Sequence, residues 1–308
     1  MLRHISQEIL KRLRKAPSMI FPLTPPLPLP VGVNEQELFE YVTSIRVQDA
    51  PEAEMRAYGT HDFRRFVYTL GLAKDIKGNC LELGGNPYFT TMLLKNFTEL
   101  NISIANYFGN VENGEYIQKV DYLDIKNKTN QTEIINYQHF NVETDKFPYD
   151  NEQFDLVIFG EIIEHLLNDP SKVLREIKRI LKKNGQLILT TPNVARLENI
   201  SRLISGANIY DPYSGYGPYG RHNREYNRHE LVNLLQFEGF DVIDHFTADV
   251  HENISQNYCN VQDLEPLINF RSSDLGQYIF LKAKVNSEII AETRPSWLYR
   301  SYPEGSLS

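Results

Sequence analysis

The sequence predicts an α/β protein: a doubly wound, mostly parallel seven-stranded sheet with helices on both faces and an N-terminal helical extension. From Gly78 onward, short apolar strands alternate with amphipathic helical stretches. Such strand–helix repeats form parallel sheets that are covered on both faces. The hydrophobic fraction of 41% and the charged fraction of 23% are those of a folded globular protein. No apolar run approaches the roughly 20 residues that a membrane-spanning helix needs.

The segment before the repeat is predicted to have two parts. Residues 1–33 combine a short basic amphipathic helix, over residues 1–15, with a proline-rich linker. We favour a helix docked on this domain or on a subunit over peripheral contact with an anionic membrane, because one short helix is a weak membrane signal. Residues 34–77 are predicted to form a helical cap that covers one side of a pocket.

The cap is expected to contain two helices. Asn34 and Glu37 have the spacing of a capping box, and the helix that they begin would run to about Val47. Pro51 is suited to the first turn of a second helix, which would stop at Gly71.

Residues 78–285 are predicted to form the main domain. Within it, the Gly- and Tyr-rich tract 205–227 is expected to be a lid, and residues 286–308 form a tail outside the motif. Ligands of such sheets bind beyond the carboxyl ends of the strands, so we look for chemistry directly after each strand. The predicted strands are 79–83, 102–106, 137–142, 154–159, 186–190, 241–245 and 278–284, with a hairpin inserted at 116–125. The predicted helices are 90–97, 169–184 and 228–238.

The first strand ends in a turn that does not suit a dinucleotide. A dinucleotide fold needs glycine at the first, third and sixth positions of this turn. Here those positions hold Gly84, Asn86 and Phe89. Glu82, two residues before the turn, would repel a phosphate. A carboxylate beside Gly84 and Gly85 suits a cationic ligand that is rich in hydrogen-bond donors, such as S-adenosylmethionine.

Three later segments strengthen this interpretation. Residues 160–166 (GEIIEHL) follow the fourth strand, residues 181–193 (LKKNGQLILTTPN) surround the fifth, and residues 215–226 form the glycine–tyrosine tract. Together with the first strand, they resemble class I S-adenosylmethionine-dependent methyltransferases, in particular the bacterial sugar and natural-product O-methyltransferases. The resemblance spans Gly78 to about Val242, roughly half of the chain.

The resemblance implies that S-adenosylmethionine lies across the strand ends. Asn106 stands where an acid usually holds the ribose hydroxyls, and Asn141 stands where an acid or amide meets the adenine amine. Asn86 and Tyr88 stand where glycines are commoner in the turn. The asparagines in place of acids predict a looser cofactor site, not a lost one. The positions assigned to cofactor binding are Glu82, Gly84, Gly85, Asn86, Pro87, Asn106, Tyr107, Asn141, Val142, Glu161 and Ile162.

Methyl transfer to a hydroxyl needs a base or a metal, because a neutral sugar hydroxyl is weakly acidic. The catalytic candidates are Glu164 and His165, in the E-x-x-E-H segment, and His222 in the lid. If that segment begins a helix, Glu161 and His165 share a face. The metal candidates Glu161, Glu164, His165 and His222 resemble the metal site of the small-RNA terminal 2′-O-methyltransferases and the E-x-x-E-H of ubiquinone-pathway O-methyltransferases. This resemblance implies a divalent metal, Mg²⁺ or Mn²⁺. The alternative is a metal-free site in which a histidine orients the acceptor or acts as the base.

The sequence therefore predicts an S-adenosylmethionine-dependent O-methyltransferase that acts on a sugar or another small hydroxylated acceptor. Two alternatives stay open: an RNA 2′-O-methyltransferase-like enzyme, and a non-catalytic binding subunit with a methyltransferase fold. Nucleic acid is disfavoured, because 32 Lys and Arg face 40 Asp and Glu, a formal net charge of −8. Cys80 and Cys259 form no CxxC pair, which suits a reducing cytoplasm.

Overall fold

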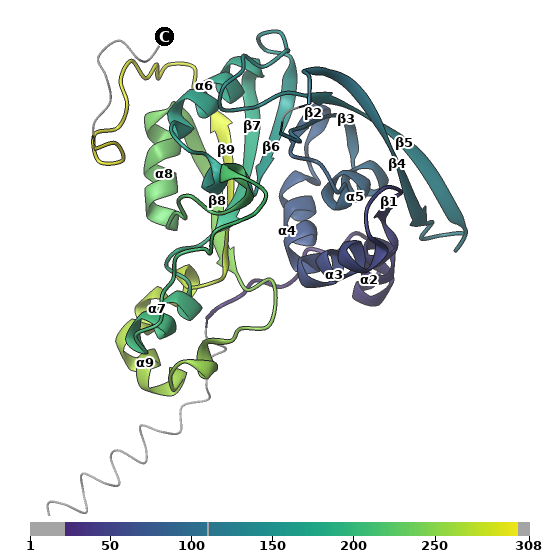
Figure 1. Ribbon diagram of the computed structural model, residues 1–308. Helices are drawn as coiled ribbons and strands as arrows, with labels where there is room; N and C mark the ends of the chain where they lie inside the picture. Colours follow the sequence, from purple (N-terminus) through teal and green to yellow (C-terminus); the bar gives the residue numbers. More distant parts are fainter. Residues whose placement is uncertain (1–21, 110, 301–308) are drawn as a thin grey trace, which may run out of the picture.

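The computed structural model describes residues 22–109 and 111–300, so the helix predicted over residues 1–15 lies outside the described part. The described chain forms a nine-stranded sheet in the order β1-β4-β5-β3-β2-β6-β7-β9-β8 (Figure 1). The strands β5, β3, β2, β6 and β7 run parallel, whereas β9 is antiparallel to β7 and β8. The predicted α/β class is confirmed. The seven expected strands are extended by β4 and β1, which add to the β5 edge in antiparallel pairing.

The strands are β1 (Arg46–Val47), β2 (Lys77–Leu83), β3 (Glu99–Asn106), β4 (Gly114–Leu123), β5 (Asn130–His139), β6 (Phe154–Gly160), β7 (Leu181–Pro192), β8 (Phe240–Ala248) and β9 (Tyr278–Val285). The α-helices are α2 (Glu35–Ser44), α3 (Glu52–His61), α4 (Phe63–Ala73), α5 (Phe89–Phe97), α6 (Pro170–Ile180), α7 (Leu197–Ile204), α8 (Arg228–Phe237) and α9 (Val261–Ile268). Short 3₁₀ turns include η1 (Ile163–His165) and η2 (Pro218–Gly220). Within the described residues, every helix is too short or too polar to cross a membrane.

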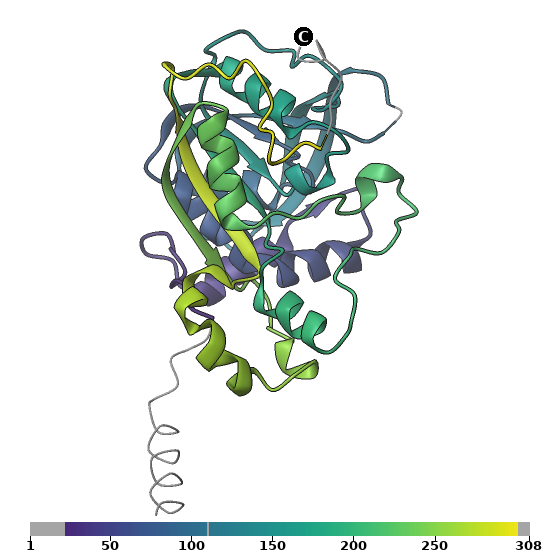
Figure 2. The same ribbon diagram turned by 90° about the vertical axis from the view of Figure 1, so that its left-hand side faces the viewer.

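The sheet separates two hydrophobic cores, because successive side chains of a strand point to opposite faces. In β6, Leu156 and Ile158 pack with the apolar faces of α4 and α5, whereas Val157 and Phe159 pack with those of α6 and α8. Figure 1 shows these helix pairs on the two sides of the sheet. The unpredicted helices α7 and α9 lie together beyond the carboxyl end of β7 and share a small third cluster (Figure 2).

The helix predicted from Pro51 to Gly71 is in fact two helices, α3 and α4, which meet at Asp62. The Asp62 backbone has φ −101° and ψ 10°, outside the helical region. Its buried carboxylate accepts two hydrogen bonds from Arg65, at 3.1 and 2.6 Å. The break turns α4 so that its apolar residues cover the sheet, while α3 passes over the edge of the ligand pocket described below.

Three other boundaries differ from the prediction. Helix α2 has the predicted capping box but ends earlier, at Ser44. Strand β5 begins at Asn130 because it pairs with β4 at ten positions, so the predicted hairpin at 116–125 is one arm of a long β4–β5 ribbon. Helix α6 ends at Ile180, and Asn184, with φ 64°, lies within a register shift between β6 and β7.

Residues 22–33, part of the stretch whose prolines predict a semi-rigid strap or linker, pack on the core, and we call them the strap. Tyr68 of α4 donates a hydrogen bond to the Pro25 carbonyl at 2.5 Å. Pro28 lies so close to Gly71 that a Cβ on this glycine would come within 2.2 Å of the proline ring.

The C-terminal segment 286–300 also packs on the domain. Its Arg294 and Tyr299 side chains both bond to the carboxylate of Asp169, the residue that caps α6. The segment therefore braces the start of α6, directly after η1.

Candidate active site

The turn between β2 and α5 brings the backbone to the ligand side of the sheet. Gly84 has φ +70°, a left-handed conformation that favours glycine, and a Cβ there would lie 2.9 Å from Cδ1 of Ile162. Glu82 is buried at the end of β2 and accepts a 2.5 Å hydrogen bond from Thr91. Burial raises the pKa of Glu82 to about 7, although the Thr91 bond and the charge of Arg65 oppose the shift.

Side-chain hydrogen bonds hold this turn at Asn86 and Tyr88, the two positions where the resemblance implies that glycines are commoner. Asn106 accepts a hydrogen bond from the Asn86 backbone amide at 2.9 Å and donates one to the Tyr88 hydroxyl at 3.0 Å. Gln118 of β4 accepts from both Tyr88 and the Asn86 side chain. The side chain of Asn106, predicted to bind the ribose, thus also ties the turn, and it keeps one further donor and acceptor position.

Two adjoining cavities lie beyond the strand ends, and Gly84, Glu161 and Ile162 line both. The strand-end cavity has a volume of about 180 Å³ and the turn cavity a volume of about 250 Å³. The strand-end cavity is also lined by Ala105, Asn106, Tyr107, Phe140, Asn141, Val142, His165, Leu166 and Tyr219. The turn cavity is also lined by Tyr58, Arg65, Phe66, Thr69, Glu82, Leu83, Gly85, Asn86, Pro87, Phe89, Thr90, Ile158, Gly160 and Thr190. All the positions predicted to bind the cofactor therefore surround one cleft, while their contacts with it stay predictions.

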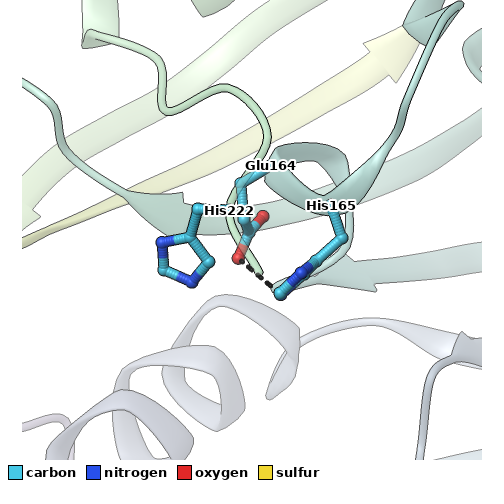
Figure 3. A group of neighbouring side chains, drawn as sticks. All are labelled: Glu164, His165 and His222. Atoms are coloured by element: carbon cyan, nitrogen blue, oxygen red, sulfur yellow. Dashed lines mark ion pairs between the residues drawn. The ribbon is translucent and has the colours of Figure 1, made fainter. Parts of the chain in front are cut away.

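Glu164, His165 and His222 form a cluster at this cleft, with one ligand atom of each lying within 4.8 Å of the others. Figure 3 shows the Glu164 carboxylate between the two rings. His165 donates from Nδ1 to the Arg221 carbonyl at 2.9 Å, and His222 donates from Nδ1 to the Glu225 carboxylate at 2.9 Å. Both acceptors lack a proton to give, so the Nε2 atom of each neutral ring carries the free lone pair.

Glu164 has its side chain fully buried, with two unlike oxygens. Oε2 accepts a 2.9 Å hydrogen bond from Thr191, whereas Oε1 has no hydrogen-bond partner within the described residues. Burial raises the pKa of Glu164, and the charge of His222 opposes this shift. An unpaired buried oxygen is costly, which marks Oε1 as an atom that a ligand would complete.

Glu161 does not belong to this cluster, which corrects the expected shared face of Glu161 and His165. The segment forms no α-helix: Glu161 has φ 55°, and only the short η1 follows. Its carboxylate instead accepts a 2.8 Å hydrogen bond from Thr190 of β7. Burial raises the pKa of Glu161; Arg65 opposes the shift and the charge of Glu164 adds to it.

The two histidines are held in opposite electrostatic environments. Burial and the neighbouring His222 lower the pKa of His165. For His222, burial is outweighed by the hydrogen bond that its ring donates to Glu225 and by the charge of Glu164, so its pKa is raised. Arg196 in turn contacts the second oxygen of Glu225 at 2.5 Å, so an arginine–carboxylate pair fixes the His222 ring.

The comparison with protein families decides the identity. Residues 55–245, more than half of the chain, match the family described as a methyltransferase domain. The chain belongs to this methyltransferase family. It is an S-adenosylmethionine-dependent methyltransferase, because S-adenosylmethionine is the cofactor of the family.

Several solved structures are similar to this methyltransferase at low sequence identity. One is a chain from the complex between the Haloferax volcanii Trm112 methyltransferase activator and its methyltransferase partner. This chain is 15% identical, with a TM-score of 0.48, and the alignment covers 78% of the present chain and 99% of the other. A Thermotoga maritima S-adenosylmethionine-dependent methyltransferase is 15% identical, with a TM-score of 0.45 and coverages of 75% and 94%. The Mesorhizobium loti enzyme of the same description is 11% identical, with a TM-score of 0.40 and coverages of 70% and 95%. No curated protein matches the chain.

The cap helices supply cleft residues that the sequence reasoning missed. Arg65 is buried in the wall of the turn cavity, where it bonds Asp62 and, at 2.6 Å, the Tyr58 hydroxyl. Its guanidinium also lies over the Phe66 ring, 4.8 Å from the centroid. The i,i+3 spacing of Asp62 and Arg65 was the available signal, because an ion pair inside an apolar helix marks a buried charge.

The residues that line the methyltransferase cleft suit the charged groups of S-adenosylmethionine. Gly84 leaves room for a ligand at the junction of the two cavities, where any side chain would meet Ile162. The turn cavity combines acids, Glu82 and Glu161, with the cation Arg65. Carboxylates suit the ammonium and sulfonium groups of this cofactor, and a guanidinium suits its carboxylate.

Proposed function

We propose that the chain is an O-methyltransferase that transfers the methyl group of S-adenosylmethionine to a hydroxyl of a sugar or another small hydroxylated acceptor. The observation that carries this proposal is the cluster of Glu164, His165 and His222 at the cofactor cleft, in which neither Nε2 atom has a hydrogen-bond partner among residues 22–109 and 111–300. An acceptor hydroxyl must lose its proton, and this cluster is built to take one.

In this proposal His165, Glu164 and His222 have separate roles. Bound S-adenosylmethionine supplies an electrophilic methyl group. His165 is held by the Arg221 carbonyl with its Nε2 lone pair available, so it accepts the proton of the acceptor hydroxyl. Glu164 stabilises the imidazolium that forms, because its Oε1 lies 3.9 Å from His165 Nε2. His222, fixed by Glu225, completes the site from the lid.

The same three side chains also fit a divalent metal such as Mg²⁺ or Mn²⁺. The unpaired Glu164 oxygen and the two free Nε2 atoms form a mixed oxygen and nitrogen set. The Nδ1 atoms of His165 and His222 donate hydrogen bonds to a carbonyl and a carboxylate. Hydrogen bonds of this kind orient histidines that bind a metal through the other ring nitrogen. A metal held by Glu164, His165 and His222 would lower the pKa of the acceptor hydroxyl. Glu161 would not be a ligand in this arrangement.

A carbohydrate or ring-shaped acceptor is supported by the aromatic lid, residues 205–227. Its Tyr210, Tyr213 and Tyr216 side chains are 85%, 93% and 95% exposed. Exposed aromatic faces suit sugar rings, and the net charge of −8 disfavours a nucleic acid. Cys80 and Cys259 are both free thiols, which supports a reducing cytoplasm as the place of action.

The test is methyl transfer to a panel of sugars and small hydroxylated compounds, using radiolabelled S-adenosylmethionine. We expect His165→Ala and His222→Ala each to lower turnover by about 10²–10⁴ and to leave the affinity for S-adenosylhomocysteine nearly unchanged. Loss of activity with a chelator, restored by Mg²⁺ or Mn²⁺, would assign the cluster to a metal; chelator-insensitive activity would assign it to the direct base. Near-normal turnover of both variants would contradict the proposed site.

A further inference from the structure

Tyr219 is the side chain by which the lid lines the strand-end cavity. Its hydroxyl donates a hydrogen bond to the Glu143 carboxylate at 3.0 Å and accepts one from the Asn141 side chain at 3.3 Å. Its ring meets Tyr107 edge to face, with centroids 5.7 Å apart. Tyr107, Asn141 and Tyr219 all line the strand-end cavity, so the lid supplies part of the cavity wall.

A second contact ties the lid to the catalytic cluster. The Asn223 backbone amide donates to the Glu164 carbonyl at 2.7 Å, and its side chain donates to the His165 carbonyl at 2.9 Å. Between the two contacts, His222 enters the cluster, three residues after Tyr219. Three residues span at most about 10 Å, so a lid that lifts Tyr219 away from the cavity also pulls on His222.

We propose that Tyr219 is a positioning residue that couples the filling of the strand-end cavity to the presence of His222 in the catalytic cluster. The inference rests on the proposed function and on the predicted cofactor contacts, in which Asn106 meets the ribose and Asn141 the adenine; both residues line this cavity. A ligand in the cavity touches Tyr219 only when the lid is closed. It therefore binds the closed state more tightly and shifts the lid toward it. The cofactor thus binds first and completes the catalytic cluster before the acceptor arrives.

The test follows the closure of the lid and needs no acceptor. Chymotrypsin cuts after Tyr210 and Tyr213 only when their segment detaches and extends into the protease, and mass spectrometry identifies the cuts. In the closed lid the two rings are exposed, but the segment between them is held by the hydrogen bond from the His222 amide to Asp211 at 3.0 Å. S-adenosylhomocysteine at 100 times its Kd should slow these cuts by up to about 100-fold in the wild-type chain, because a ligand specific for one state stabilises it by RT ln(1 + [L]/Kd). In Tyr219→Ala, with the ligand at 100 times the Kd that calorimetry gives for this variant, the protection should fall below about 3-fold.

The matched control is Tyr216→Ala, which removes a 95% exposed ring of the same lid. It should keep wild-type protection. If Tyr219→Ala binds no ligand, Tyr219→Phe takes its place, since it keeps the ring and loses both hydroxyl hydrogen bonds; its protection should lie below that of the wild type. Equal protection in the wild type and the Tyr219 variant would overturn the coupling alone. Absence of S-adenosylhomocysteine binding by the wild type would overturn the proposed function as well.

A second readout reports on His222 itself. The ring Cε1–H resonance of His222, identified by its loss in His222→Ala, should shift when S-adenosylhomocysteine binds to the wild-type chain. In Tyr219→Ala the same ligand should leave this resonance in place. A purely structural role of Tyr219 predicts the reverse, because it would disturb His222 before the ligand is added and leave the ligand response intact.

Discussion

The two carboxylate oxygens of Glu164 have different roles, one structural and one functional. One of its oxygens is used by Thr191, and the chain also uses its backbone carbonyl to accept hydrogen bonds from the Asn223 and Arg224 amides. The other oxygen lies 3.9 Å from Nε2 of His165 and has no hydrogen bond within the part of the chain that the structure describes. Leaving a buried oxygen unpaired costs about 1–3 kcal/mol. A chain tolerates this cost where a ligand, a proton or a metal uses the atom.

At the same scale, Gly84 tests the placement of the cofactor. Gly84→Ala adds a Cβ at 2.9 Å from Ile162 and imposes φ +70° on a residue with a side chain. We expect the affinity for S-adenosylhomocysteine to fall by at least 10-fold, and Gly84→Val to abolish binding, measured by calorimetry. The control is Gly32→Ala, because Gly32 has a similar φ of +78° and open space around it. Equal affinity in Gly84→Ala and Gly32→Ala would remove the cofactor from this turn.

At the scale of elements, regular periodicity was predictable and irregular turns were not. The strand at 154–159 follows directly from a continuous apolar run. In contrast, the E-x-x-E-H spacing suggested a helix that would pair Glu161 with His165. The left-handed backbone at Glu161 turns its carboxylate toward Thr190 and leaves Glu164 for the cluster. Backbone conformations of this kind depend on contacts with β7, which the local sequence does not contain.

The contact of the C-terminal segment with α6 gives a prediction about pH. Burial tends to raise the pKa of Asp169, but hydrogen bonds from Arg294 and Tyr299 and the charge of Arg294 outweigh it, so the pKa is lowered overall. A lowered pKa stabilises the fold above the unfolded value of about 3.9, and this stabilisation is lost as the pH falls through the folded value. Arg294→Ala should therefore unfold more easily in urea at pH 7, by about 1.5–3 kcal/mol.

The difference between Arg294→Ala and the wild type should narrow as the pH falls below about 4. Arg300→Ala is the control, because Arg300 is an exposed arginine of the same segment. A gap that stays constant down to pH 3 would show that Arg294 acts through packing and not through the Asp169 charge.

At the scale of the whole molecule, the sequence predicted the sheet and the cleft but separated parts that fold together. The composition of the proline-rich stretch predicts an extended strap or linker, but not the surface on which it packs. The structure packs the same extended chain along α4 as the strap, where prolines lose little entropy on binding. The cap helices likewise share their core with β2, β6 and β7. The sequence did not predict Arg65 as a cleft residue, because α4 brings it to the cleft only by packing on distant strands of the sheet.

The strap predicts an energetic coupling between two residues far apart in the sequence. Pro28 occupies the space beside Gly71 where a Cβ would come within 2.2 Å of its ring. Gly71→Ala should therefore lower the free energy of unfolding by about 1–3 kcal/mol. In a Pro28→Gly background, the same substitution should be neutral or stabilising by about 0.5–1 kcal/mol, because alanine favours a helix over glycine. Urea unfolding of the four chains gives the interaction energy. Equal destabilisation by Gly71→Ala in both backgrounds would mean that the strap does not hold α4 in solution.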